Sequence, residues 1–423
     1  MKIKPINQVD SKIYDYVVED FSLIQKESQE VFVKKHCVER GLNRHYIDTV
    51  PSLPGIIKGA YSLDGNIYVY CDDGFIYKIE NGNAIQVLEV EWCGLPPRLF
   101  HVVYQGKVVL LVIKNTGECV LYDNEVLSTF TIENARFSLN FAGRLFVATD
   151  NKIYYSQLFD YVDFSSGLYG GGSISIDYYA GEILGLFKMD NKIIVVTTKK
   201  IYSIVCFGDN VQFKLKEMAS LEHDVLADSV KKLTKSIVFV SNNKVYSYAN
   251  GSLSELSDTF DRLGYVSQGE FSSDRSRYYA LVKKPDSQDR YVYSISVSDG
   301  YECFSLSDAY LFLDEGVILS IFANCYSFVE DNGANELTKK FKTIPIRFNT
   351  EKTKKIIEVE LISKSSAKMI IESNGKVREY NVKEGYNAIK VLLTGQAFTF
   401  AFFSEDNEFK IKNMHCKYMI KGA

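Results

Sequence analysis

A two-strand pattern returns along most of this chain at intervals of 37 to 48 residues. Each copy has a β-rich apolar run, a short polar turn and a second run, as in NIYVYCDDGFIYKI at residues 66–79. The copies are residues 66–79, 107–122, 144–158, 192–206, 236–249, 277–297 and 317–329. A period of this size is typical of the four-stranded blades of a β-propeller.

Each copy is expected to form a hairpin. Residues that tolerate positive φ separate the two runs at Asp73-Gly74, Asn115-Thr116-Gly117, Asp150-Asn151 and Asn242-Asn243. The first run at residues 108–113 is apolar without alternation, which predicts a strand covered on both faces. A parallel α/β sheet would also bury both faces, but it needs a crossover of a dozen or more residues between strands. The short turns therefore favour antiparallel blades.

The pattern predicts seven blades. Six is the alternative, because the sixth copy has a long polar turn at residues 283–290 and the seventh lacks a clear turn residue. One repeat cannot bury its apolar face alone, so ring closure should stabilise the whole, and deletion of a blade should unfold it. The segment EVFVKK at residues 30–35 could supply the strand that closes the ring.

The pattern changes after Asn332-Gly333. Short strands are expected at residues 344–348, 356–362, 368–373, 376–382, 387–393, 398–403 and 410–420, with a hairpin turn at Asn374-Gly375. Seven short strands in this space predict a β-sandwich. The expected chain is all-β, with an N-terminal arm (1–45), a propeller (46–335) and a C-terminal sandwich (336–423).

Composition agrees with a folded, sheet-rich protein. The chain has 29 Tyr and 27 Phe but only 7 Pro and 1 Trp, and aromatic residues favour pleated sheets. It contains neither an apolar stretch of signal-peptide length at its start nor about 18 uncharged apolar residues in a row, so export by that route and membrane spanning are not expected. Its 8 cysteines form no C-x-x-C pair, which predicts reduced thiols from a cytosolic site of synthesis.

Charge is distributed unevenly along the chain. Residues 336–423 hold 17 Lys and Arg against 10 Asp and Glu, a net charge of +7. The whole chain has a net charge of −4, so residues 1–335 carry −11. The basic C-terminal part is a candidate docking face for an acidic surface.

The search for catalytic or ligand-binding motifs assigns no catalytic, cofactor-binding or metal-binding residue. The five histidines, His36, His45, His101, His223 and His415, lack the spacing of a zinc site. Gly170-Gly171-Gly172-Ser173 is expected in a loop between the third and fourth blades instead of a phosphate-binding turn.

Carboxylates are the catalytic groups that propeller loops can bring together. Asp72, Asp73, Asp160 and Asp163 are candidates, but turn chemistry or solvation explains each of them. The only tryptophan, Trp92, gives few platforms for sugar stacking. The sequence lacks a dense Lys/Arg cluster with interleaved aromatic residues, which is the pattern that would indicate nucleic-acid binding. A non-enzymatic scaffold or binding ring is therefore favoured.

Several segments resemble bacteriophage tail β-propeller proteins. GRLFVATDNKIYYSQLFDYVDFSSG, residues 143–167, resembles the signature run of that family, and residues 181–205 and 229–257 are similar to its next two blades. Residues 343–361, 373–382 and 417–422 resemble its terminal β-sandwich. The resemblance covers roughly residues 40–423, and the run Tyr161-Val162-Asp163-Phe164 departs from the family pattern.

The resemblance implies a virion structural protein of a phage tail, such as a nozzle, muzzle or hub, or a head-to-tail connector. Such a protein would be made in the host cytoplasm and would join other tail or connector proteins. It would form a homo-oligomeric ring in the virion and could be a monomer in isolation. Genome DNA would pass through or beside the ring during ejection without specific binding. The −11 of residues 1–335 could then repel DNA phosphates from the wall of an assembled ring, or it could lie outside for solubility.

Two other functions remain open. The first is a receptor- or glycan-binding propeller, and exposed aromatic residues around one mouth of the ring would favour it, whereas aromatics on the outer wall or the sandwich would favour assembly. The second is a propeller glycosidase or lyase, which would need two inward carboxylates about 5–10 Å apart.

Overall fold

The computed structural model describes residues 13–91, 96–166, 170–205, 213–257, 264–272, 274–283, 290–298, 300, 302–313, 316–329 and 338–421. These residues form an all-β structure whose short 3-10 turns, η1 (Ser22–Ile24), η2 (Tyr178–Ala180) and η4 (Ala227–Ser229), are the only helical pieces of the described chain. No helix within these residues is long and apolar enough to span a membrane.

Seven four-stranded antiparallel sheets account for most of the described chain. The first three sheets are β6 (Ile57–Leu63), β7 (Asn66–Cys71), β8 (Phe75–Glu80) and β9 (Asn83–Glu89); β10 (Arg98–Tyr104), β11 (Lys107–Ile113), β12 (Glu118–Tyr122) and β13 (Val126–Thr131); and β14 (Phe137–Phe141), β15 (Arg144–Ala148), β16 (Lys152–Tyr155) and β17 (Gly172–Ser175). The next two are β18 (Ile183–Met189), β19 (Lys192–Thr197), β20 (Lys200–Val205) and β21 (Lys214–Ser220); and β22 (Lys231–Lys232), β23 (Ile237–Ser241), β24 (Lys244–Ala249) and β25 (Ser252–Ser257). The last two are β26 (Tyr265–Phe271), β27 (Arg277–Lys283), β28 (Arg290–Ser296) and β29 (Glu302–Ser307); and β30 (Ala309–Phe312), β31 (Ile318–Ser320), β32 (Asn324–Val329) and β5 (Asn43–Thr49).

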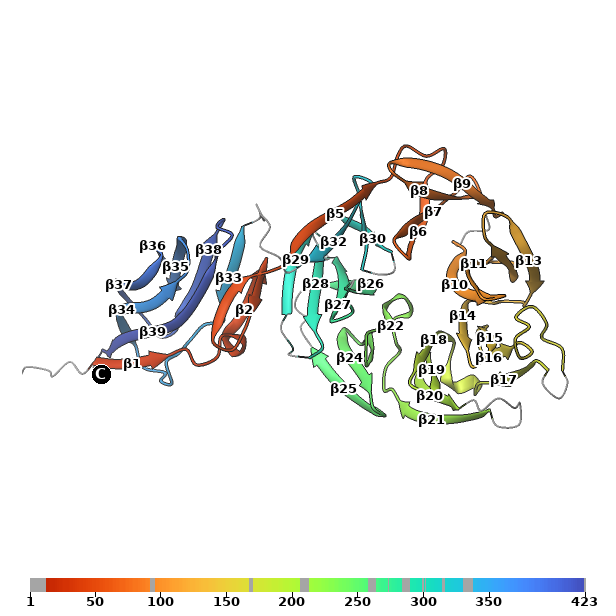
Figure 1. Ribbon diagram of the computed structural model, residues 1–423. Helices are drawn as coiled ribbons and strands as arrows, with labels where there is room; N and C mark the ends of the chain where they lie inside the picture. Colours follow the sequence, from red (N-terminus) through yellow and green to blue (C-terminus); the bar gives the residue numbers. More distant parts are fainter. Residues whose placement is uncertain are drawn as a thin grey trace, which may run out of the picture.

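The sheets are arranged like propeller blades around a ring (Figure 1). The first strand of each sheet lies nearest the middle, and the fourth strand lies on the outer wall. Seven apolar clusters fill the spaces between successive sheets, including the space between the seventh sheet and the first. Stacking against two neighbours explains why middle strands such as β11 and β15 are apolar on both faces.

All seven predicted hairpins are confirmed as the two middle strands of a sheet. Gly74, Gly117, Asn242 and Asn243 take positive φ at the predicted turns. Neither residue of the Asp150-Asn151 turn has a positive φ. In this turn the Thr149 hydroxyl accepts a hydrogen bond from the Lys152 N–H at 3.3 Å. The polar turn at residues 284–289 lies outside the described residues.

The predicted ring-closing strand is wrong. Residues 30–35 contain β3 (Val31–Val33), which pairs with β4 (Cys37–Arg40) outside the ring. The strand that completes the seventh sheet is β5, which pairs antiparallel with β32. The physical reason is burial: all three residues of β3 are buried, whereas an outermost strand such as β5 keeps an exposed side.

Two larger sheets form a second unit, here called the two-sheet unit. One sheet has β3, β4, β39 (Lys410–Ile420), β34 (Lys354–Ser363) and β37 (Gly385–Gly395), with β1 (Ile13–Val17) paired to β39. The other has β2 (Gln25–Gln29), β33 (Lys339–Thr343), β38 (Thr399–Ser404), β35 (Ala367–Ser373) and β36 (Lys376–Val382). Both sheets contribute to one apolar core.

The two-sheet unit differs from the predicted C-terminal part in two ways. The arm predicted at residues 1–45 is not a separate element, because β1 and β4 pair with β39, β2 pairs with β33, and β3 pairs with β4. The strand predicted at residues 344–348 is also wrong, since the strand lies at Lys339–Thr343 and only an isolated bridge forms at Ile346. The predicted boundary at Asn332-Gly333 lies outside the described residues. The Asn374-Gly375 turn is confirmed, with φ of 49° and 71°.

Strand β3 joins the two-sheet unit to the ring. Val31 and Val33 belong to the core of the two-sheet unit, whereas Phe32 between them belongs to the cluster between the sixth and seventh sheets. This is the alternation of side chains that a β-strand imposes. At the same junction, the Glu30 N–H donates to the Phe304 carbonyl at 2.7 Å. The buried Glu30 carboxylate accepts the Leu306 N–H at 2.5 Å.

Candidate functional site

The ring has two faces that the strand order defines. The loops that lead into each innermost strand, and the turns between second and third strands, lie on what we call the start face. The turns after first and third strands lie on the end face, because neighbouring strands are antiparallel. Asp72 and Asp73 therefore lie on the start face, and Asp160 and Asp163 on the end face.

The candidate carboxylates do not meet. Asp72 accepts the Ile56 N–H at 2.7 Å, and Asp73 accepts the Tyr77 hydroxyl at 2.6 Å, which raises the pKa of Tyr77 to about 12. On the other face, Asp163 accepts the Ser165 N–H at 2.7 Å, and this bond holds the pKa of its carboxyl below the ordinary value. These bonds are typical of turn-forming Asp. Asp72 and Asp73 lie on the opposite face from Asp160 and Asp163, so neither of the first two can pair with either of the last two as glycoside hydrolysis requires.

The other residues singled out from the sequence are dispersed. His101 contacts Asp64 at 2.9 Å, and no three His, Cys, Asp or Glu of the described chain lie together as a metal-binding group. Gly172 and Ser173, expected in a loop, begin strand β17. Burial raises the pKa of the Cys303 and Cys325 thiols to about 12. Trp92 lies outside the described residues.

Exposed aromatic side chains gather on the start face. Five of the eight exposed aromatics of the described chain lie there: Tyr178, Tyr179, Tyr265, Tyr310 and Phe322. The other three are Phe159 on the end face, Tyr46 on the outer wall and Tyr386 on the two-sheet unit. By the criterion set above, this distribution favours binding at one mouth of the ring.

Part of the start face carries several exposed apolar side chains. Tyr265 begins β26 of the sixth sheet, Tyr310 lies on β30 of the seventh, and Ile321 and Phe322 form the turn that follows β31. Ile56 precedes β6 of the first sheet and is 65% exposed. These five residues, here called the start-face arc, come from three successive sheets. Large exposed side chains grouped in this way mark interaction surfaces.

The start face is also acidic. None of its charged side chains in the described loops is buried, and they comprise eleven carboxylates and three cations. The carboxylates are Asp72, Asp73, Glu91, Glu133, Asp150, Asp177, Glu182, Glu222, Asp224, Asp228 and Asp308, and the cations are Lys114, Arg136 and Lys199. Much of the negative charge expected for the ring is thus found around one mouth.

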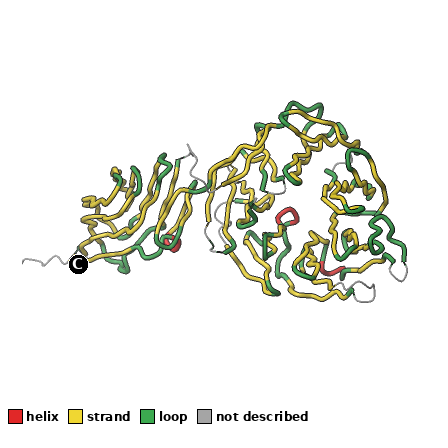
Figure 2. Tube along the Cα trace, in the orientation of Figure 1, coloured by secondary structure: helices red, strands yellow, loops and turns green. Residues whose placement is uncertain are grey.

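The loop at residues 221–230 lies across that mouth. It contains η4, the red segment near the middle of the ring in Figure 2. The Asp228 carboxylate of this loop contacts Arg98 of the second sheet at 3.5 Å, although the loop leads into the fifth sheet. Tyr278 holds the loop from below by donating its hydroxyl to the Ser229 carbonyl at 2.8 Å. Gly269 leaves room for this contact, because a Cβ there would collide with the Tyr278 hydroxyl.

The innermost strands carry the opposite charge. Their side chains include Lys58, Arg98, Lys188, Lys231 and Lys232, and their one carboxylate is Glu270. Glu270 is fully buried and forms an ion pair with Lys231 at 2.8 Å. The acidic surplus therefore lies on the loops of the ring and not on the strands around its own axis. The negative inner wall expected above for an assembled ring of several subunits stays a prediction.

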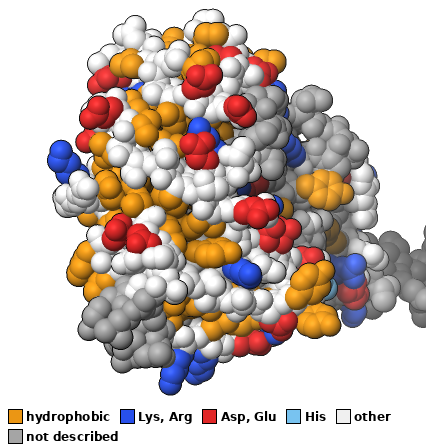
Figure 3. Space-filling view, turned by 90° about the vertical axis from the view of Figure 1, so that its right-hand side faces the viewer, with side chains coloured by type: hydrophobic (Ala, Val, Ile, Leu, Met, Phe, Trp, Pro, Cys, Tyr) orange, Lys and Arg blue, Asp and Glu red, His pale blue; other side chains and the backbone are white. Residues whose placement is uncertain are grey.

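The outer wall of the ring adds a second apolar region. Outermost strands β9 and β13 expose Ile85, Val126 and Leu127. Figure 3 views this side of the ring and shows hydrophobic side chains gathered across the middle of the wall, with acidic side chains around them. The corresponding strand of the sixth sheet, β29, is mostly buried at the junction with the two-sheet unit.

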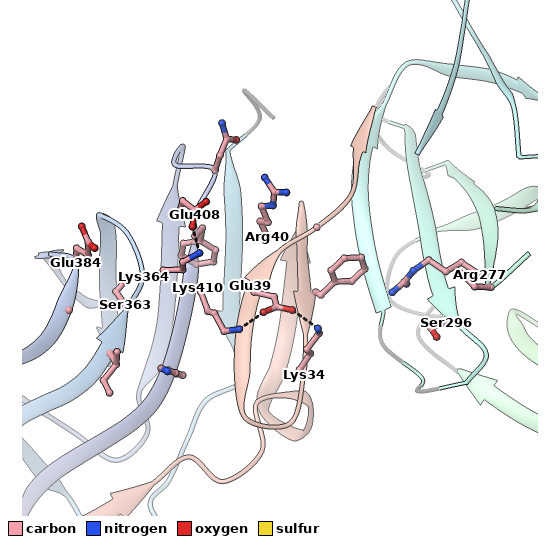
Figure 4. Close-up of a pocket in the computed structure, with 18 of the residues that line it drawn as sticks. Lys34, Glu39, Arg40, Arg277, Ser296, Ser363, Lys364, Glu384, Glu408 and Lys410 are labelled. Atoms are coloured by element: carbon pink, nitrogen blue, oxygen red, sulfur yellow. Dashed lines mark hydrogen bonds and ion pairs between the residues drawn. The ribbon is translucent and has the colours of Figure 1, made fainter. Parts of the chain in front are cut away.

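A pocket of about 790 Å³ lies at the junction between the ring and the two-sheet unit. Figure 4 shows Arg277 and Ser296 on the ring side and Lys364 and Glu408 on the opposite side. Arg40 lies between them. Sequence reasoning missed this pocket, because its walls come from segments far apart in the chain. The pairing of β4 with β39 and the packing of β3 against β29 of the sixth sheet bring them together.

Comparisons with known proteins identify no family. No family model matches the chain, and no curated protein matches it. Among solved structures, the extracellular domain of a hybrid two-component system from B. thetaiotaomicron aligns with a TM-score of 0.47 and 11% identity. That alignment covers 82% of this chain and 47% of the other, so the chain spans about half the length of that structure. A chain of the mitotic checkpoint complex aligns with a TM-score of 0.46 and 11% identity, over 68% of this chain and 94% of the other. Neither likeness carries an argument about function.

Proposed function

We propose that the seven four-stranded sheets are the blades of a seven-bladed β-propeller and that the two larger sheets form a β-sandwich. The seven inter-sheet clusters, one of which joins the seventh sheet to the first, support the blade number. The core shared by the two larger sheets supports the sandwich.

We further propose that the chain is a non-enzymatic structural subunit of a bacteriophage tail, of the nozzle, hub or connector type. The resemblance of residues 143–167 and of the following blades supports the tail assignment. The observation that carries a contact role is the start face, where an apolar arc lies among carboxylates. Apolar area provides affinity in such contacts, and charge selects the partner.

The partner of this face is a second copy of the chain. The described residues of the two-sheet unit, 13–41 and 338–421, hold 21 Lys and Arg against 15 Asp and Glu, a net charge of +6. The described start-face loops hold 3 cations against 11 carboxylates, a net charge of −8. Four of these carboxylates also form ion pairs with cations of adjacent strands, which leaves the surplus at −4: Asp72 with Lys58, Asp177 with Lys200, Asp228 with Arg98 and Asp308 with Arg44. A contact between two different surfaces repeats from copy to copy and can close into a ring. Genome DNA would pass through or beside that ring.

A pair of variants tests this contact. Ile56→Asp with Phe322→Asp places two more charges in the start-face arc and should abolish oligomers in sedimentation-velocity runs at low salt. Phe159→Asp makes the same kind of change on the end face and should leave the oligomers intact. Equal assembly of both variants would contradict the proposed contact face.

Receptor or glycan binding is the second candidate. The five start-face aromatics favour it, because flat aromatic side chains are good platforms for a bound partner. A glycan-array screen of the wild-type protein and of Tyr178→Ala/Tyr179→Ala distinguishes the two functions. Saturable glycan binding that the double variant loses, without a change in assembly, would favour this candidate.

A further inference from the structure

The junction pocket is bounded by both units. The ring contributes Ser276, Arg277, Ser296 and Ser298 from the end-face turns of the sixth sheet. The two-sheet unit contributes the β3–β4 hairpin, the end of β34, the turn before β37 and the start of β39. The volume of about 790 Å³ lies within the range of small-molecule sites.

The lining of this pocket is rich in cations. Six side chains are Lys or Arg, and three are Glu, which leaves an excess of three positive charges. The cations are Lys34, Arg40, Arg277, Lys364, Lys410 and Lys412, and the carboxylates are Glu39, Glu384 and Glu408.

The carboxylates of the pocket orient its lysines. Glu39 is shared by two lysines: it contacts Lys34, and it accepts Lys410 at 2.6 Å (Figure 4). Burial alone would raise the pKa of the Glu39 carboxyl, but the bonds from both lysines hold it below its ordinary value. Glu408 forms an ion pair with Lys364 on the opposite wall.

Polar and apolar groups complete the lining. Ser296 and Ser298 bring two hydroxyls that hydrogen-bond to each other at 3.1 Å, while the Ser276 and Ser363 hydroxyls donate to Asp274 and to the Ser365 carbonyl; the buried Phe32 and Phe409 complete the wall. Arg, Lys and Ser side chains are the usual partners of phosphate oxygens, and charge-assisted bonds to them are strong. This combination fits an anion with several oxygens better than it fits a neutral ligand.

We propose that the junction pocket binds a small ligand that carries two or more phosphate groups. Arg40, Lys410 and Lys412 would approach such a ligand from the two-sheet unit. Arg277, which is 6% exposed and stacks on Phe32 at 4.4 Å, would add its charge from the ring-side wall. A ligand held by both units would fix their relative orientation. This inference is independent of the proposed tail function.

Isothermal titration of the full-length protein with sodium tripolyphosphate tests the proposal. One ligand per chain is expected. Arg40→Gln with Lys412→Gln should weaken binding about tenfold or more, because two charge-assisted contacts are lost. Lys412→Gln alone should weaken binding in the same direction, and since this side chain is exposed, its replacement should not disturb folding.

The matched control removes two charges from the same unit outside the pocket. Lys376→Gln with Lys390→Gln, at exposed positions of β36 and β37, should bind tripolyphosphate as the wild type does. Equal weakening by both double variants would show non-specific attraction and overturn the proposal, as would the absence of heat at millimolar ligand. A DNA oligonucleotide that binds more tightly than tripolyphosphate, and that the Arg40/Lys412 variant loses, would overturn the small-ligand assignment in favour of nucleic acid.

Discussion

At the scale of single residues, Glu39 links stability to pH. Its carboxyl has a pKa below its ordinary value of 4.5, so its contribution is complete well above pH 4.5 and is lost as the pH falls through the folded-state pKa. Glu39→Gln should lower the free energy of unfolding by about 1–3 kcal/mol at pH 7. Once the pH has fallen below the lowered folded-state pKa, the difference from wild type should shrink toward zero, because both side chains are then neutral.

Urea unfolding at pH 7 and at the lowest pH at which the protein stays folded measures this difference. The control is Glu351→Gln, which removes an exposed carboxylate paired with Arg347 and should have a much smaller effect. A Glu39→Gln loss that stays constant between the two pH values would contradict the linkage.

Tyr278 is the second informative residue. Tyr278→Phe removes the hydroxyl that donates to the Ser229 carbonyl and should cost about 1–2 kcal/mol of unfolding free energy, because that carbonyl loses its buried donor. Hydrogen exchange at residues 226–230 should rise at the same time. Tyr265→Phe, at a side chain that is 65% exposed, should change neither quantity. Unchanged exchange in Tyr278→Phe would mean that other contacts hold the loop.

At the scale of elements, β3 connects the two cores. Phe32→Ala should destabilise the protein by about 3–5 kcal/mol, the usual cost of emptying a buried phenylalanine site. Leu23→Ala, at a side chain that is 77% exposed on η1, should cost little. Chemical denaturation checks both, and a loss below about 1 kcal/mol for Phe32→Ala would contradict the role given to β3.

The pairing of both chain ends predicts how fragments fold. Residues 338–421 alone lack β1–β4 and so would expose the core that Phe21, Val31 and Val38 cover. This fragment should be unfolded by circular dichroism, whereas residues 13–41 joined to it through a flexible linker should fold. A folded, monomeric 338–421 fragment would show that the N-terminal strands are dispensable.

The sequence predicts hairpins far better than long-range pairing. The alternation of apolar runs and turns is local, so all seven hairpins could be located, as could the Asn374-Gly375 turn. The pairing of β5 with β32 and of β1 with β39 joins segments hundreds of residues apart, and no local pattern identifies such partners. For this reason residues 30–35 were an attractive but incorrect closing strand.

The candidate surfaces show the same limit. Asp72 and Asp73 could be identified as turn residues, but the start-face arc needs the strand order, which brings Ile56 to the same face as Phe322. The junction pocket needs both the two-sheet unit and its packing on the sixth sheet. Neither feature has a local sequence signal beyond its individual exposed residues.

At the scale of the whole molecule, closure should make the ring cooperative. Deleting residues 42–50 removes β5 from the seventh sheet and leaves β32 with an unpaired edge. We expect the deletion variant to lose the single thermal transition of the wild type and to aggregate. Retention of a wild-type melting curve would contradict closure through β5.

Charge separation is the other property of the whole molecule. The described start-face loops have a net charge of −8 and the two-sheet unit has a net charge of +6, which favours contacts between copies. Salt weakens the attraction between such charges, with a screening length of about 10 Å at 0.1 M. Apolar contacts in the start-face arc are less sensitive to salt. Raising the salt concentration should therefore loosen the oligomer.

The mass of the purified protein in solution, measured by light scattering at increasing salt and paired with negative-stain images, tests the central claim most directly. The account predicts ring-shaped particles of several 48.1 kDa chains at low salt, with a mass that falls as salt is added. A mass of one chain at every protein and salt concentration would contradict assembly between copies through the start face.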